Sequence, residues 1–234
     1  RTRVGVLPIG NMQPLEMFAI VSEELGDEQS ALEWLKMKQQ SQPNDEQWLG
    51  LLRRSSGPEQ MLALLRPQLE QRPVLLNPHR AYQSLMEELQ PEHDLIAEYQ
   101  QLLKDNPDSG EFAYLLGRIE PDAERSQKLF EQALQADPPV AFAALALGKQ
   151  YLAEGDFPRA LKFAEQAYAL NRSDFSFQWL RRDCLLANQR YQELLEWTAS
   201  PGFGLMTGLE VQSTAMQAEA LRGKPSSESD EMRA

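Results

Sequence analysis

The side chains best suited to chemistry are few and lie far apart in the sequence. Cys184 is the only cysteine, and His79 and His93 are the only histidines, so the chain offers no Cys/His cluster at zinc-ligand spacing. Cys184 also lacks a nearby histidine that would act as its base, which favours a packed helix residue over a nucleophile. The neighbouring Arg181 and Arg182 leave the alternative open, because cations lower the pKa of a thiol.

The acidic residues and the glycines do not supply a catalytic site either. Glu23–Glu24 and Glu87–Glu88 are adjacent pairs, and adjacent side chains on a helix do not face each other. The sequence contains no G-x-x-x-x-G-K-S/T, G-x-G-x-x-G, G-x-S-x-G or H-E-x-x-H motif. We therefore expect a protein that is not an enzyme and that needs no cofactor or metal.

The composition is that of a folded, acidic protein. Its 234 residues are 42% hydrophobic, and 23 Lys and Arg against 35 Asp and Glu give a formal net charge of −12. Because nucleic-acid binding begins with neutralisation of phosphates, DNA and RNA are not expected partners. The longest apolar-rich run, 140–147, is too short to cross a bilayer, so we expect a soluble chain with no membrane insertion.

Apolar residues recur three and four positions apart between short proline- and glycine-containing breaks, a spacing that predicts helices and no strands. Asp122 and Asp156 are expected N-caps, Asp108 with Glu111 resembles a capping box, and Pro67 should kink or split its helix. The helices are expected at about 14–25, 28–41, 45–54, 58–71, 78–89, 92–105, 109–119, 122–136, 139–153, 156–170, 174–187, 190–199 and 204–222.

An internal repeat organises the second half of the chain. A shift of 34 residues superposes Lys128, Glu131, Gln132 and Ala133 on the identical Lys162, Glu165, Gln166 and Ala167. A shift of 31 aligns the preceding unit, including Leu116 and Gly117 with Leu147 and Gly148. This shorter spacing predicts that one unit has lost three residues in its inter-helix turn, between Gly117 and Ser126.

At these positions the chain resembles the tetratricopeptide-repeat family, whose unit is two helices of 34 residues with a W-x₂-L-G-x₂-Y, A-x₃-F, P pattern. The best unit, 141–174, has Leu147, Gly148, Tyr151, Ala160 and Ala167 in register and departs from the pattern at Ala144, Ala164 and Arg172. The next unit places Arg181 and Arg182 where the pattern has Leu and Gly. The resemblance covers about 92–199.

The resemblance implies an all-α fold, a right-handed α-solenoid of about six helix pairs closed by a C-terminal capping helix. The expected divisions are an N-terminal extension over 1–11, irregular helical hairpins over 12–91, tetratricopeptide-like repeats with the capping helix over 92–222, and a disordered acidic tail over 223–234. The capping helix would either close the array or dock a second copy of the chain.

The family pattern would direct seven side chains of the first helices into a concave groove. Aromatic residues mixed with cations suit a peptide that carries apolar and acidic side chains, although the apolar members equally suit core packing and the cations an ordinary surface. The family's carboxylate clamp of Lys, Asn and Arg is not recognisable. The seven candidates are Tyr114, Arg118, Phe142, Leu145, Lys149, Trp179 and Asp183.

Two functions follow from the resemblance. The first is a non-enzymatic scaffold that binds a partner protein or peptide on the concave face. The second is a regulatory or substrate-recruiting segment of a larger enzyme or membrane-anchored assembly factor, whose other part would lie upstream of Arg1. Cysteine usage leaves the compartment open, whether cytoplasmic or, with a removed signal or anchor, periplasmic or otherwise extracytoplasmic. A catalytic role for Cys184 is a third, poorly motivated alternative.

Overall fold

Helices form every regular element in the described part of this computed structural model, which comprises residues 56–172, 174–199 and 208–222 and isolated positions between 26 and 53. The chain divides into two compact units, residues 1–101 and 102–234. The helix predicted over 14–25, the N-terminal extension and the acidic tail lie outside the described residues, as do most of the helices predicted over 28–41 and 45–54.

Unit 1 contains α4 (Pro58–Leu69), α5 (Leu76–Leu89) and the first part of α6 (Leu95–Asp105). Of the two outcomes predicted for Pro67, a kink or a split of its helix, the split does not occur, because α4 is one continuous helix that ends two residues beyond this proline. The missing N–H of Pro67 removes a single hydrogen bond near the C-terminal end, where the helix is about to stop. The helix α5 packs against α4 and places a buried polar residue, His79, next to α6.

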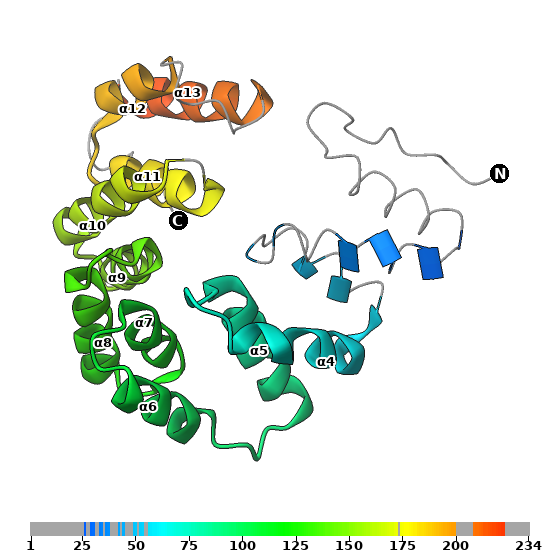
Figure 1. The fold of residues 1–234 in the computed structure, drawn as a ribbon. Coiled ribbons are helices and arrows are strands. Elements are labelled where there is room, and N and C mark those ends of the chain that lie inside the picture. Colours follow the sequence, from blue (N-terminus) through cyan, green and yellow to red (C-terminus); the bar gives the residue numbers. More distant parts are fainter. Residues whose placement is uncertain are drawn as a thin grey trace. The chain divides into compact units, whose positions relative to one another are not determined.

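Unit 2 consists of helical hairpins in which each helix packs against its successor in the sequence (Figure 1). The observed bounds differ from the predicted ones by a few residues at most. The all-α fold of stacked hairpins, an α-solenoid, is thus confirmed for this unit. Its helices are α7 (Gly110–Ile119), α8 (Ala123–Gln135), α9 (Ala141–Ala153), α10 (Phe157–Leu170), α11 (Phe175–Ala187), α12 (Tyr191–Thr198) and α13 (Gly208–Arg222).

Polar N-caps fix where several of these helices begin. The predicted caps are confirmed at Asp122, which accepts a hydrogen bond from Arg125 N at 2.8 Å, and at Asp156. The predicted cap at Asp108 is wrong by one residue, because the Ser109 hydroxyl accepts the bond from the backbone of α7 and Asp108 does not. Serine and aspartate are similarly good caps, so residue type alone does not choose between neighbours.

The unit aligned by the 31-residue shift is three residues shorter than the unit that follows it. The missing residues belong to its first helix and not to the turn between its helices. The loops 120–122 and 154–156 have equal length, whereas α7 has 10 residues and α9 has 13. The segment from Gly117 to Ser126 is therefore mostly helical, and the expectation of a shortened turn is wrong. The Ser126 hydroxyl donates to the Gly117 carbonyl at 2.7 Å and ties α8 to the end of the shorter helix.

Small residues let the helices of a hairpin approach closely, as the repeat pattern predicts. A Cβ atom at Gly148 would lie 2.7 Å from Leu180 Cδ2 and 3.5 Å from the Ala160 carbonyl oxygen. At Gly117, the equivalent residue of the preceding unit, a Cβ would lie 2.8 Å from the ring of Phe130. At Gly117 a Cβ would displace the ring of the hairpin partner, whereas at Gly148 it would reach the backbone of α10 at ordinary contact distance and displace Leu180 of the next unit, so a larger residue at either position requires a neighbour to shift.

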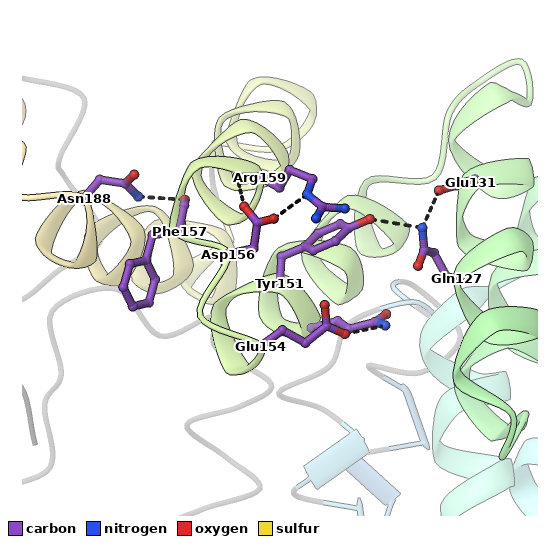
Figure 2. Close-up of polar contacts among 9 residues, drawn as sticks. Gln127, Glu131, Tyr151, Glu154, Asp156, Phe157, Arg159 and Asn188 are labelled. Carbon is purple, nitrogen blue, oxygen red and sulfur yellow. Dashed lines mark hydrogen bonds and ion pairs between the residues drawn. The ribbon is translucent and has the colours of Figure 1, made fainter.

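Tyr151 makes contacts both within its own hairpin and with the preceding one, and Figure 2 shows its hydrogen bond to Gln127. The rings of Tyr151 and Phe163 stack with their centroids 5.5 Å apart, and the Arg159 guanidinium lies 4.6 Å from the Tyr151 ring centroid. Gln127 on α8 donates both to Tyr151 Oη at 3.0 Å and to Glu131 at 2.8 Å. Tyr151 therefore links α8 of one unit to α9 and α10 of the next.

The last helix, α13, packs against α12. Thr214, Ala218 and Leu221 form its buried side, whereas Met216 is 69% exposed. The buried side chains are spaced three and four residues apart, as expected for a helix that covers the end of a hairpin stack. This arrangement is compatible with the predicted capping role.

The turns at Gly155 and Gln189 occupy equivalent places in successive units and make the same backbone hydrogen bonds, although the two residues differ. Opposite substitutions at these two positions therefore test one effect. Gly155 has φ +79° and Gln189, 34 positions later, has φ +59°. A Cβ at Gly155 would meet no atom within 4 Å, so Gly155→Ala should destabilise the protein by about 1 kcal/mol through backbone strain alone. Gln189→Gly should relieve such strain and leave stability equal or higher, as measured by urea denaturation. Equal losses from both changes would contradict this account.

Candidate functional site

The apolar candidates form a row of ring contacts across the first helices of the units. Tyr114 stacks on Phe142 with centroids 5.9 Å apart, and Phe142 contacts Phe177 at 5.2 Å. Tyr114 and Leu145 are only 4% and 7% exposed, while Phe142 and Trp179 are half-buried. The structure therefore gives Tyr114 and Leu145 a mainly packing environment and leaves the rings of Phe142 and Trp179 more accessible.

The charged candidates are more open to solvent. Arg118 and Lys149 are exposed, and Asp183 is half-buried. Asp183 Oδ1 accepts hydrogen bonds from Arg182 Nε at 2.9 Å and from Arg182 Nη2 at 2.6 Å. The same guanidinium lies 3.8 Å from the centroid of the Trp179 ring. Trp179, Arg182 and Asp183 thus form one cluster on α11, in which Arg182 connects the two predicted residues.

A pocket of about 400 Å³ lies beside this cluster. It is bounded by the end of α9, the start of α10, one side of α11 and the last helix α13. Of the seven candidates only Asp183 lines this pocket. The repeat pattern from which the candidates were chosen does not include α13, which forms one of the walls. The lining residues are Leu152, Phe157, Arg182, Asp183, Leu186, Ala187, Gln217 and Leu221.

Arg181 has a side chain of a type common at binding sites, but it lies in the protein core. It is 9% exposed and donates from Nε to Glu165 at 2.8 Å, with Glu193 at 3.5 Å from Nη2. Its guanidinium lies 4.4 Å from the Trp197 ring centroid and 5.0 Å from that of Tyr168. The arginine occupies the position of the pattern's leucine and joins α10, α11 and α12 through charge and stacking.

Cys184 lies in the interior of unit 2. Its side chain is 0% exposed, and burial, with smaller contributions from Asp183 and Glu165, raises the pKa of the thiol to about 12. The idea that Arg181 and Arg182 lower this pKa is wrong, because both guanidinium groups are engaged with carboxylates. A buried thiol with a raised pKa is a poor nucleophile.

The two histidines have different environments. His79 is 1% exposed, with Nδ1 at 2.9 Å from Tyr99 Oη, and burial lowers its pKa to about 4. His93 is exposed and lies 2.7 Å from Glu98. Among the described residues, no group of three or more His, Cys, Asp or Glu side chains is arranged to hold a metal ion.

Residues 145–197 match the family model of the tetratricopeptide repeat. This segment extends from within α9 to within α12, so the hairpins of this part of the chain are tetratricopeptide repeats and the predicted resemblance is confirmed. Repeats of this kind typically serve as protein–protein interaction scaffolds.

The comparison with solved structures returned tetratricopeptide-repeat proteins at low identity. One from Parabacteroides merdae has 15% identity and a TM-score of 0.45, with 94% of this chain and 96% of that chain covered. A second, from Thermus thermophilus, has 19% identity and a TM-score of 0.37, with 88% and 97% covered. No curated protein gave a significant match. None of the described helices has the length and apolar character needed to cross a bilayer.

The buried His79 predicts a pH-dependent stability. The unfolded chain binds a proton on this residue near pH 6.5 and the folded chain only near pH 4, so the free energy of unfolding should fall as the pH drops between these values, by about 3 kcal/mol in all. Comparison with His79→Gln removes the contribution of the carboxylates common to both proteins. The stability difference between wild type and variant should shrink from pH 7 to pH 4. A difference independent of pH would contradict the assignment.

Cys184 predicts a thiol that is protected in the native protein. Iodoacetamide should leave Cys184 unmodified at pH 8 under native conditions and modify it fully in denaturant, because only the exposed thiolate reacts. A variant with an added cysteine at an exposed position, Ala153→Cys, provides a positive control for the reagent. Mass spectrometry reports the modified residue, and rapid native alkylation at Cys184 would contradict the observed burial.

Proposed function

We propose that unit 2 is a non-enzymatic scaffold that holds a protein or peptide partner on the concave face of its repeats, formed by the first helices α7, α9 and α11. The observation that carries the proposal is a repeated pairing on these helices. Each has an apolar residue followed four positions later by a charged one: Tyr114 with Arg118, Leu145 with Lys149, and Trp179 with Asp183.

The pairing places two kinds of side chain on one face of each helix, since residues four apart are neighbours on the helix surface. Arg118 and Lys149 are exposed, so both charged groups lie at the surface of their helices. Among the paired apolar residues Trp179 is half-buried and Leu145 is 7% exposed, and Phe142, also on α9, is half-buried like Trp179. A partner would therefore find its apolar contact at Phe142 on α9 and Trp179 on α11, and charged side chains along all three helices.

The charges of this face support a partner with acidic side chains. Two of the three repeated charges are cations, whereas the chain as a whole has a net charge of −12. A local cationic row on an acidic protein favours association of an acidic segment at that row and disfavours it elsewhere. Aromatic residues next to such cations are the residue types that contribute most to interface affinity.

Affinity capture with a groove variant tests the proposal. Lys149→Glu combined with Trp179→Ala should abolish capture of a partner from an extract of the source cells, because it reverses an exposed charge and removes the accessible ring. The matched control, Lys162→Glu with Leu170→Ala, makes similar changes at exposed positions of α10. Circular dichroism and thermal melting should first show that both variants are folded.

Three results are informative. A partner retained by wild type and the control but lost by the groove variant supports binding at the first helices. Loss in both variants, or equal capture by all three proteins, contradicts the proposed face. Quantitative mass spectrometry of the captured proteins distinguishes these results.

A further inference from the structure

We infer that the pocket between α9, α11 and α13 receives one apolar anchor residue of a partner peptide that carries a carboxylate about one helical turn from the anchor. This inference rests on the proposed function and specifies the chemistry of the partner. It also adds the last helix, α13, to the interaction surface.

The walls of the pocket are suited to an apolar side chain. Leu152, Phe157, Leu186, Ala187 and Leu221 supply carbon surface from four helices, α9, α10, α11 and α13. The volume of about 400 Å³ lies at the small end of the range for ligand pockets. Contacts of this kind typically take a single leucine, methionine or phenylalanine of a bound segment, as in the recognition of helices by grooves.

The polar side chains at the rim of the pocket differ in whether they can bind a partner. Asp183 already accepts two hydrogen bonds from Arg182, so its charge is compensated within the cluster. Gln217 on α13 is exposed, and its amide can bond to the backbone or a polar side chain of a partner. The rim therefore contributes little net charge from Arg182 and Asp183 together.

Lys149 supplies the surplus charge. It lies one helical turn before the pocket residue Leu152, on the same side of α9. It is exposed, and no residue of the described part of the chain forms an ion pair with it. A peptide whose apolar residue enters the pocket would present its neighbouring turn to Lys149, and a carboxylate there would complement the charge.

Selection from a display library of random 16-residue peptides on the full chain tests this chemistry without knowledge of the natural partner. We expect the enriched peptides to share a large apolar residue with Asp or Glu three or four positions away. The affinity of one enriched peptide, labelled with a fluorophore, is then measured by anisotropy with the wild type and with two variants.

The variants separate the anchor from the charge. Ala187→Phe fills the pocket and should weaken binding at least about tenfold, while Ala153→Phe, the same change at the equivalent exposed position of the preceding unit, should not. Lys149→Glu should weaken binding about fivefold, and a peptide with its acidic residue changed to Lys should recover affinity for this variant. Lys162→Glu is the charge control.

Enrichment of peptides that lack an acidic residue, or affinity that Ala187→Phe leaves unchanged in a folded protein, would overturn the inference. So would the absence of any enriched peptide. These failures are distinguishable from failure of the proposed function, because a partner captured by wild type and lost by the groove variant would still place binding on the first helices while excluding this pocket as the anchor site.

Discussion

The hairpins of unit 2 depend on the close contact between α9 and its neighbours at Gly148. A Cβ at this position would lie 2.7 Å from Leu180 Cδ2 on α11, so this side chain would have to move, while the nearest backbone atoms of α10 are at the ordinary contact distance of 3.5 Å. The face of α9 that contains Gly148 is thus turned toward α10 and α11, which defines the rotation of the helix about its axis. Residues 145 and 152 lie three positions before and four positions after Gly148 on the same side of the helix, and the exposed Lys149 lies next to them. The accessibility of Lys149 and the place of Leu152 in the pocket wall are consequences of that rotation.

Most of the architecture could be predicted because its determinants are local. The spacing of apolar residues defines the helices, and proline, glycine and polar caps define the breaks, so the observed bounds agree with the prediction to within a few residues. The errors occur where two neighbouring residues or segments are equally compatible with the local sequence. Ser109 and Asp108 are both competent caps, and an alignment that skips three residues does not say whether helix α7 or its loop is shorter.

The candidate site was only partly predictable, because exposure depends on residues distant in sequence. The pattern selects Tyr114, Leu145 and Trp179 equally, yet the ring of Phe142 covers the first and neighbouring helices enclose the second. The pocket escaped prediction because one wall is α13, which lies beyond the recognisable repeats. Arg181 would be expected on the surface by residue type, and only its contacts with Glu165 and Trp197 explain its burial.

Arg181 also limits how an array of this kind could grow by duplication of its last unit. In the present chain the arginine is paired with Glu165, which belongs to the preceding unit. The residue 34 positions after Glu165 is Ala199, so a tandem copy would place its own arginine opposite an alanine and leave this buried cation with only the longer contact to the copy's equivalent of Glu193, which destabilises the copied unit. The unit with Leu147 at this position has no such requirement. The two neighbouring repeats are therefore not interchangeable modules, and lengthening of the array is favoured upstream of Arg181.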